Sequence, residues 1–339
     1  MNGRPTIADV AQRAGVTRST VSHAVSGKRP VSEELRRKVF AAIAELGYKP
    51  SFAARTLRGE RTRVIAGLFD NVSLGGALPI QLFSDGLRKR DYIFSAWFCE
   101  TGEDASRAMK SLGTGMADAV VNAMPKISAH EAAMACHPLP TVTFLRNYEG
   151  APVALDEKTP YYETLDYLWR LGHRRIGLFY DENTGIAGKS NPRADAYQAF
   201  MTARNSYDPE LVREIHTVTH TSGFDLGQVM APLFHAKGCS AILCSGDMEA
   251  LGILAWAKSK GVSVPEALSV VGQEDIPFAR LSVPSLTSLH VPLEEIIEAT
   301  IDALLAKLEP IPRNVRAKPF SHYKLMVRDS TGPARQTAS

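Results

Sequence analysis

Cysteine is scarce in this sequence, and long apolar runs are absent. The four cysteines form no CxxC pair and no Cys/His cluster with zinc-ligand spacing; they are Cys99, Cys136, Cys239 and Cys244. Because disulfide frameworks and zinc sites depend on such spacing, we interpret them as reduced core residues of a cytoplasmic protein. No segment reaches the ~18 consecutive apolar residues of a membrane helix, and the N-terminus leads into no apolar run. We therefore expect neither a membrane span nor a secretory signal.

Motifs of the common catalytic classes are also missing. The sequence has no G-x-S-x-G, no HExxH and no plausible arrangement of Ser, His and Asp. Residues 183–190 differ from a P-loop only by Asn183 in place of the first glycine. A P-loop helix should begin at its lysine, whereas Asn191 and Pro192 suit the N-cap and first residue of a helix that starts later. We predict a protein that is not an enzyme and holds no cofactor or metal.

Positive charge is concentrated at the N-terminal end. Residues 1–60 hold 11 Lys and Arg against 5 Asp and Glu, a net charge of +6. The remainder holds 28 of the 39 basic residues and 31 of the 36 acidic ones, a net charge of −3. This contrast suggests a polyanion-binding module joined to a different body, although a solvated basic surface would give the same count.

The first predicted helix spans residues 6–14. Thr6 and Asp9 have the spacing of a capping box, in which each side chain satisfies an N–H group at the helix start. Gly15 follows the helix, where a tight turn needs a residue that tolerates positive φ.

Two further helices are predicted nearby. Thr17 is a good N-cap for a helix over residues 17–25, and Ser32 caps a third helix that Gly47 ends. Two short helices joined by a glycine-containing turn, with a supporting third helix, are typical of a helix-turn-helix. A small helical bundle that binds no nucleic acid would show the same pattern.

In a helix-turn-helix the second helix enters the major groove with its N-terminal residues toward the bases. Arg18 is placed to reach a guanine there, and Ser19 and His23 are placed to read neighbouring bases.

From residue 62 the pattern changes to apolar runs that alternate with helical stretches. The predicted strand and helix pairs are 64–69 with 78–90, 92–98 with 103–112, 119–124 with 128–136, 175–180 with 192–203, 215–218 with 222–236, and 240–244 with 247–260. Continuous apolar strands between amphipathic helices indicate parallel sheets that are covered on both faces. The length of this part suits two such lobes.

Residues 5–62 closely resemble the headpiece of the LacI/GalR transcription regulators. The match runs without a gap and includes Ala14-Gly15-Val16-Thr17, Thr20-Val21-Ser22 and Gly47-Tyr48-Lys49-Pro50, followed by Ala54-Arg55 and Leu57-Arg58. The resemblance implies sequence-specific binding to double-stranded DNA. The DNA-contacting residues that it implies are Thr6, Thr17, Arg18, Ser19, Thr20, Ser22, His23, Lys49, Ala54 and Leu57.

In this family the segment after the headpiece is a hinge, which here is residues 50–61. It would form a helix when two subunits meet on DNA, with Leu57 as a wedge in the minor groove. An ordinary contact within a linker helix is the alternative for Leu57, and its basic neighbours favour the wedge. His23 stands where the family often has arginine, so the base preference at that position is open, because histidine has no bidentate fork.

The rest of the chain resembles the family's effector domain, which is built like the periplasmic sugar-binding proteins. Three stretches carry the match: Gly172-His173-Arg174-Arg175-Ile176, Arg193, and residues 240–292. The resemblance implies three crossings between lobes, near residues 157–160, 287–291 and 316–322. The effector then lies outside the carboxyl ends of the strands. The implied effector contacts are Asp70, Arg146, Arg193, Asp247 and Glu274.

Alternatives stay open for several of these positions. Arg193 could be a surface arginine, although a helix start disfavours a cation. Asp247, and Asp156 at a lobe edge, serve equally well as helix caps. The family usually has asparagine where this chain has Gly246, and Gly-Phe-Asp-Asp where it has residues 272–275 (Gly-Gln-Glu-Asp). The effector need not be a standard hexose.

We therefore predict an α-helical helix-turn-helix headpiece over residues 1–49 and a hinge over residues 50–61. An α/β effector-binding and dimerisation domain of two parallel-sheet lobes, like a periplasmic binding protein, follows over residues 62–330, and a disordered tail over residues 331–339. The predicted function is a repressor that binds an inverted-repeat operator as a homodimer or tetramer. Its small polar effector would be a sugar, polyol or sugar acid. The alternatives are a regulator that needs its ligand to bind DNA, as in the purine-responsive branch, and a cytoplasmic sugar-binding protein without DNA binding.

Overall fold

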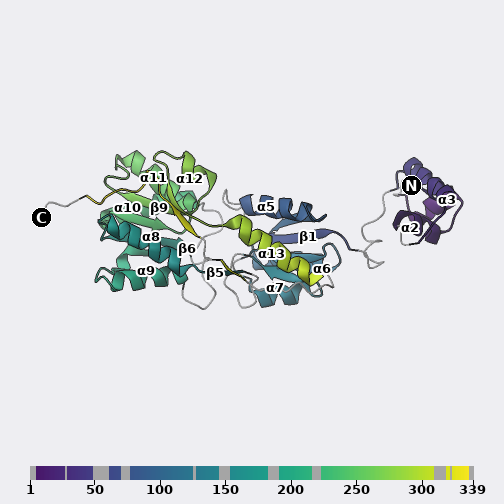
Figure 1. The fold of residues 1–339 in the computed structure, drawn as a ribbon, viewed down its shortest axis with the longest axis horizontal. Helices are drawn as coiled ribbons and strands as arrows, with labels where there is room; N and C mark the ends of the chain where they lie inside the picture. The colour runs from purple at the N-terminus through teal and green to yellow at the C-terminus, as the bar shows by residue number, and fades with distance from the viewer. Residues whose placement is uncertain are drawn as a thin grey trace. The chain divides into compact units, whose positions relative to one another are not determined.

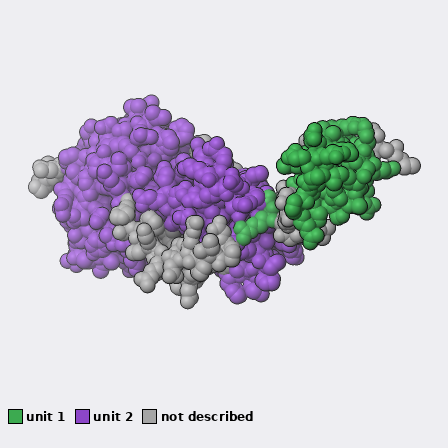
Figure 2. All heavy atoms as spheres, turned by 45° about the vertical axis from the view of Figure 1, so that its right-hand side comes forward, with its two compact units in different colours: residues 1–62 green, residues 63–339 purple. Residues whose placement is uncertain are grey.

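The computed structural model contains two compact units, residues 1–62 and residues 63–339 (Figure 2). Each unit is described by itself. The described residues are 5–26, 29–48, 61–69, 77–124, 127–144, 153–181, 191–215, 223–308, 318–320 and 323–335.

The first unit begins with the helix that the capping box predicts, α1 (Ile7–Ala14). The backbone N–H of Thr6 donates to Asp9 Oδ2 over 2.7 Å, and the N–H of Asp9 donates to Thr6 Oγ1 over 3.4 Å. Gly15 follows with φ 66°, which allows the chain to turn sharply into the next helix. The predicted capping box and turn are both confirmed.

Helices α2 (Arg18–Ser26) and α3 (Glu33–Leu46) complete this unit. Thr17 Oγ1 accepts from the N–H of Thr20, Ser32 Oγ accepts from the N–H of Leu35, and Gly47 ends α3. One valine from each helix is fully buried in the common core; these are Val10, Val21 and Val39. The apolar spacing of the three helices therefore closes into one small core, as the sequence predicts.

The second unit has two lobes, each a parallel sheet between helices (Figure 1). The first lobe has four parallel strands in the order β2-β1-β3-β4. Helices α5 and α13 pack on one face, and α6 and α7 pack on the other. The bounds are β1 (Val64–Phe69), α5 (Ala77–Arg88), β2 (Ile93–Phe98), α6 (Gly102–Gly113), β3 (Ala119–Asn122), α7 (Ala129–Cys136), β4 (Thr141–Thr143) and α13 (Leu293–Leu308).

The second lobe has a six-stranded sheet in the order β12-β10-β9-β8-β6-β7, parallel except for β12. Helices α8 and α9 cover one face, and α10, α11 and α12 cover the other. The bounds are α8 (Lys158–Arg170), β6 (Ile176–Asp181), α9 (Pro192–Thr202), β7 (Val212–Ile215), α10 (Gly223–Ala236), β8 (Ala241–Cys244), α11 (Asp247–Lys260), β9 (Ser269–Glu274), α12 (Pro277–Leu281), β10 (Thr287–His290) and β12 (Lys324–Met326). Parallel strands buried on both faces explain the continuous apolar runs of the sequence.

The chain passes between the lobes at three places. It leaves β5 (Val153–Leu155) for α8, leaves β10 for α13, and leaves β11 (Lys318–Phe320) for β12. Strands β5 and β11 pair in parallel beside each other. All three crossings lie within a few residues of the predicted positions.

One predicted strand is misplaced. The strand expected over residues 215–218 is β7, Val212–Ile215, at the edge of the second sheet. Its central residues Arg213 and Glu214 are polar, as edge strands often are, so it lacks the apolar run that marks the inner strands.

The predicted disordered tail begins too early. Residues 331–334 are bound to the second lobe, because Thr331 Oγ1 contacts Tyr167 Oη at 2.8 Å and the N–H of Ala334 donates to Leu171 O. The carbonyl oxygen of Gly332 also lies 3.0 Å from His173 Nε2, within hydrogen-bond distance. Residues 336–339 lie outside the described part of the chain. Among the described helices, none is long and apolar enough to cross a membrane.

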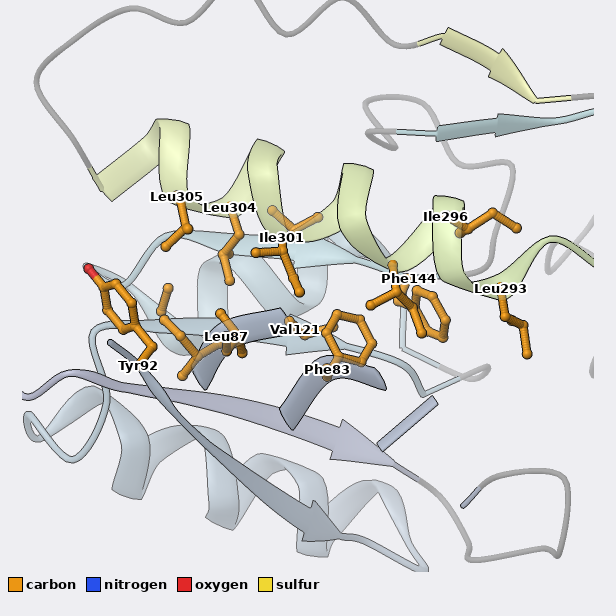
Figure 3. Close-up of a cluster of buried hydrophobic side chains, with 14 of the residues drawn as sticks. Phe83, Leu87, Tyr92, Val121, Phe144, Leu293, Ile296, Ile301, Leu304 and Leu305 are labelled. Carbon is orange, nitrogen blue, oxygen red and sulfur yellow. The ribbon is translucent and has the colours of Figure 1, made fainter. Parts of the chain in front are cut away.

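The core of the first lobe depends on a helix that is remote in sequence. Ile301 and Leu304 of α13 pack onto Phe83 and its neighbours on α5 and the sheet (Figure 3). The Phe83 ring lies 4.9 Å from that of Phe144, measured between centroids. A Cβ at Gly86 would come within 2.6 Å of Ile301 Cδ1, so α5 and α13 are closely packed at this glycine.

Phe83→Ala should therefore lower the free energy of unfolding by about 3–5 kcal/mol, because it removes a fully buried ring from this core. Urea unfolding of the full chain measures the change. Met134→Ala, at a position 67% exposed in the same lobe, is the control and should change stability by about 0.5 kcal/mol or less. Equal losses in the two variants would contradict the packing described for α13.

Candidate functional site

The start of α2 presents polar side chains to solvent. Thr17, Arg18 and Ser19 are exposed, and Thr20, Ser22 and His23 are partly exposed. The Thr17 hydroxyl lies 2.8 Å from the hydroxyls of both Ser19 and Thr20. This polar group marks the end of the helix that a helix-turn-helix directs toward DNA.

Burial on the opposite side fixes this orientation. Val21 and Ala24 of α2 are buried against α1 and α3, so the polar residues of the helix must face outward. Lys49, Ala54 and Leu57 lie outside the described residues, and their DNA contacts stay predictions.

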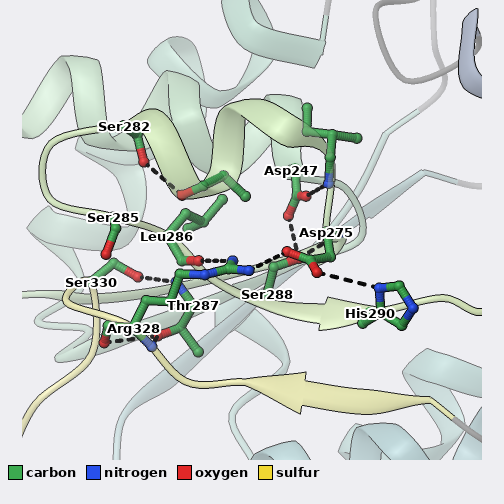
Figure 4. Close-up of polar contacts among 12 residues, drawn as sticks. Asp247, Asp275, Ser282, Ser285, Leu286, Thr287, Ser288, His290, Arg328 and Ser330 are labelled. Atoms are coloured by element: carbon green, nitrogen blue, oxygen red, sulfur yellow. Dashed lines mark hydrogen bonds and ion pairs between the residues drawn. The ribbon is translucent and has the colours of Figure 1, made fainter.

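A second polar site lies at the carboxyl ends of the parallel strands in the second lobe (Figure 4). Asp247, the first residue of α11, is fully buried. Ser288 Oγ on β10 donates to its Oδ1 over 2.6 Å, and the N–H of Ile276 donates to its Oδ2 over 2.8 Å. Asp247 therefore joins the start of α11 to strand β10 and to the turn after β9. It does not serve as a cap of its own helix.

The turn after β9 has a strained backbone. Glu274 and Asp275 have φ values of 103° and 57°, in the left-handed region that costs non-glycine residues about 1–3 kcal/mol each. Asp275 forms an ion pair with Arg328, lies 3.3 Å from His290 Nδ1, and donates its N–H to Ser288 Oγ. These contacts hold Asp275 inward and leave Glu274 exposed.

Burial raises the pKa of Asp247 to about 7, and the nearby Asp275 adds to this rise, while the hydrogen bonds from Ser288 and Ile276 oppose it. The pKa of Glu274 is also raised, first by loss of solvation and then by the carboxylates of Glu249 and Asp247. Because the Glu274 side chain is still exposed to solvent, its loss of solvation is only partial, and the rise is smaller than full burial would give.

Arg193 lies at the first turn of α9. Asn191 is the N-cap and Pro192 the first helical residue, as predicted from their sequence. The Arg193 side chain is buried, its Nη2 donates to Glu157 Oε1 over 2.9 Å, and its guanidinium lies 5.7 Å from the centre of the Tyr161 ring. Its other two donors, Nε and Nη1, are buried without an acceptor among the described residues.

Such donors are costly. A buried donor without an acceptor lowers the stability of the folded state by about 1–3 kcal/mol relative to a paired donor, and by more when the donor is charged. Arg193 is thus an integrated part of a polar site, and it is not the surface arginine that the sequence left open.

Sequence reasoning gave no role to Glu157, Tyr161 or Gln273. The Tyr161 hydroxyl donates to Gln273 Oε1 over 2.8 Å, and both residues are buried. Gln273 is a polar residue in an otherwise apolar strand, which was a signal that it has a buried partner. Nothing in the sequence pointed to Glu157 or Tyr161.

Asp156 is a helix cap, one of the two roles left open for it. Its Oδ1 accepts from the N–H groups of Lys158 and Thr159 at the start of α8, over 3.0 and 3.1 Å. The hydrogen bond from the Thr159 side chain is the main cause of a lowered pKa of Asp156; burial opposes it, and the two backbone hydrogen bonds add to it. Asp70 and Arg146, also predicted as effector contacts, lie outside the described residues.

Comparison with known proteins matches both units. Residues 6–51 match the family described as "Bacterial regulatory proteins, lacI family", and residues 165–331 match "Periplasmic binding protein-like domain". The HTH-type transcriptional repressor PurR of Escherichia fergusonii is 29% identical, over 97% of this chain and 98% of the relative. PurR of Salmonella typhi is 28% identical, over 89% and 90%.

The chain combines a LacI-family DNA-binding domain with a periplasmic-binding-protein-like domain.

Solved structures share the fold of this two-domain chain. A Lac repressor dimer bound to operator and an anti-inducer has a TM-score of 0.76 at 23% identity, covering 97% of this chain and 100% of the other. A LacI-family regulator from Silicibacter pomeroyi has a TM-score of 0.80 at 17% identity, covering 97% and 99%. A complex of the regulator CelR with cellobiose has a TM-score of 0.65 at 24% identity, covering 96% and 100%.

Asp247 gives a pH-dependent test of the polar site in the second lobe. Its pKa is about 7 in the folded protein against an ordinary value of 3.8, so the folded state binds an extra proton between these pH values. The stability from this proton is complete below the ordinary pKa and is lost as the pH rises through 7. In urea unfolding, the free energy of unfolding of the wild type should fall relative to that of Asp247→Asn as the pH rises from about 5 to 8.

Glu266→Gln is the control for this comparison, because Glu266 is exposed in the same lobe. Its stability difference from the wild type should stay flat over the same range. A flat difference for Asp247→Asn as well would show that the carboxyl is ionised throughout.

Proposed function

We propose that this protein is a transcription repressor that binds an inverted-repeat operator as a homodimer. A small polar effector would raise or lower its affinity for the operator. One observation carries the proposal: a helix with an exposed polar face and a buried arginine whose two donors have no acceptor among the described residues lie in two separate compact units of one chain. The protein would act in the cytoplasm by binding and not by catalysis, with residues 50–61 as the hinge.

The relatives support both halves of this proposal. The curated relatives are named repressors, and one solved relative of the same fold is bound to operator. Others are described with cellobiose or with ribose. A sugar-type ligand therefore suits the fold, and the residues at the site decide which one.

Exposed apolar side chains support the dimer. Phe278 and Leu281 on α12 and Val283 just after it are 47%, 75% and 84% exposed. A cluster of this kind on a water-soluble surface is typical of a protein contact. We assign it to the subunit interface, because one reading helix contacts too few base pairs for specificity and two half-sites are needed.

Arg193 and Glu274 form the centre of the proposed effector site. Arg193 supplies two buried donors that need acceptors, and Glu274 supplies an exposed carboxylate on a strained turn. Asp247 holds this turn in place by accepting a hydrogen bond from the N–H of Ile276. The sign of the response is not fixed by this geometry, so a ligand that strengthens DNA binding, as in the purine-responsive branch, is the second candidate.

Arg18→Ala should weaken binding to the preferred DNA site by about 1–3 kcal/mol and relax the preference at one base pair. The preferred site is found by selection from random DNA with the full chain, and affinity is measured by fluorescence anisotropy. Arg13→Ala is the matched control, because Arg13 is an exposed arginine that pairs with Glu45 on α3. An unchanged base preference in Arg18→Ala would remove α2 as the reading helix.

Arg193→Ala should abolish the ligand response and leave DNA binding by the free protein near normal. The readout is the shift in unfolding temperature with cellobiose, ribose, glucose, sorbitol and gluconate, followed by DNA binding with each ligand that stabilises the wild type. Arg204→Ala is the control, since Arg204 is in the same lobe and its Cζ lies 3.6 Å from the centre of the Phe200 ring. A ligand response of equal affinity in Arg193→Ala would disprove the assignment of this pocket.

A further inference from the structure

Gln273 is a buried glutamine at the carboxyl end of β9, directly before the turn that carries Glu274. Only 4% of its surface is exposed, so its amide group needs hydrogen-bond partners within the protein or on a ligand. The amide oxygen has such a partner, because the Tyr161 hydroxyl donates to Oε1 over 2.8 Å. The amide nitrogen, Nε2, donates to no acceptor among the described residues.

Tyr161 determines which way this amide faces. The oxygen and the nitrogen of an amide have nearly the same shape, so their hydrogen-bond partners decide their positions. Burial raises the pKa of the Tyr161 hydroxyl, which therefore keeps its proton and acts as a donor. The amide oxygen must then face Tyr161, and the two N–H groups of Gln273 face away from it.

Arg193 lies against the ring of the same tyrosine, with its Cζ 5.7 Å from the ring centre. Its Nη2 donates to Glu157 Oε1 over 2.9 Å, and Nε and Nη1 have no acceptor among the described residues. One side chain, Tyr161, therefore spans two buried groups that each hold unpaired donors. What the two groups need in common is a ligand that supplies acceptors.

The unpaired donors of Arg193 call for two separate acceptor atoms. Nη2 stands between Nε and Nη1 on the planar guanidinium, so these two donors lie on different edges. A carboxylate binds along one edge and could not accept from both. The charge of Arg193 is already matched by Glu157, whose side chain is only 13% exposed. An acid would therefore bring a negative charge to a group of residues that holds no unpaired cation.

We propose that Gln273 is a ligand-binding residue of the proposed effector site, that its amide N–H groups and the two free donors of Arg193 bind three separate oxygens of the ligand, and that this end of the ligand is uncharged. Tyr161 is then a positioning residue, because it acts through the amide of Gln273. The inference rests on the proposed function and narrows its ligand to neutral compounds with several hydroxyl groups, to the exclusion of sugar acids.

The first test uses ligands that are matched in shape and differ in charge. The pairs are glucose with glucuronate, sorbitol with gluconate, ribose with ribonate, and cellobiose with cellobionate. The unfolding temperature of the full chain is measured with each compound at the same concentration and pH 7. We expect at least one neutral compound to raise the unfolding temperature, and its acid to raise it less or not at all.

Variants of Gln273 then test its contact with the neutral compound that stabilises most, by isothermal titration calorimetry. Gln273→Met keeps the length of the side chain and removes the amide, so binding should weaken by about tenfold. Gln273→Glu places a carboxylate oxygen where the amide nitrogen was, and it should weaken binding further because two oxygens then repel each other. Gln198→Glu is the matched control, since Gln198 is exposed on α9 in the same lobe, and it should bind as the wild type does.

Tyr161→Phe separates positioning from a merely structural role. Loss of the hydroxyl leaves the amide free to turn, so ligand affinity should fall while Gln273 is present. In the Gln273→Met background the same change should cause no further loss, because no amide is left to position. A structural role of Tyr161 alone would weaken binding by the same factor in both backgrounds, and that result would remove the positioning role.

Three results would overturn the inference. These are wild-type affinity for the neutral compound in Gln273→Met and Gln273→Glu, an acid that binds as tightly as its neutral partner, and a panel in which no neutral compound stabilises the protein. If Gln273→Glu does not fold, Gln273→Met decides. A neutral compound whose binding is lost in Arg193→Ala and unchanged in Gln273→Met would remove Gln273 and keep the proposed effector site. Failure of the proposed DNA-binding function is seen separately, as the absence of any DNA sequence preference that depends on Arg18.

Discussion

The buried carboxylate of Asp247 is the constraint on which the proposed effector site depends. It accepts one hydrogen bond from Ser288 on β10 and one from the N–H of Ile276 after β9. A buried carboxylate without donors costs several kcal/mol, so both donors must keep their places when the chain folds. The turn between β9 and α12 is thereby fixed.

The fixed turn explains why two adjacent carboxylates have different roles. Asp275 is drawn inward by Arg328 and His290, while Glu274, at φ 103°, is left exposed at the strand end. The strain of two left-handed residues is offset by these contacts and by the bond from Asp275 to Ser288. The site is therefore assembled by folding itself, and a ligand meets side chains that are already in place.

Local spacing was enough to predict much of this protein, and contacts between distant residues were not predictable. The Thr6 and Asp9 box, the Asn191 cap and the inner strands follow from neighbours in the sequence. The Tyr161 to Gln273 bond joins residues 112 positions apart, and the polar edge strand β7 has no apolar run to mark it. The close approach of the Glu249 carboxylate to Gly246, where an added Cβ would lie 2.3 Å from Oε2, exists only in three dimensions.

The same contacts connect the effector site to the first lobe. Strand β10 carries Ser288, which binds Asp247, and continues through His290 into α13, whose Ile301 and Leu304 are packed in the core of the first lobe. The turn after β9 and the core of the first lobe are therefore joined by one continuous run of contacts and backbone. Converting a 99:1 population into 1:99 needs about 5.5 kcal/mol of difference in ligand binding between the two states. Hydrogen bonds to charged groups contribute about 1.5–3 kcal/mol each, so about two to four of them are needed, and they must form in one arrangement of the lobes only. In the proposed effector site, the two donors of Arg193 and the carboxylate of Glu274 would supply three such hydrogen bonds, so the contacts that select the proposed effector would also drive the proposed change of state.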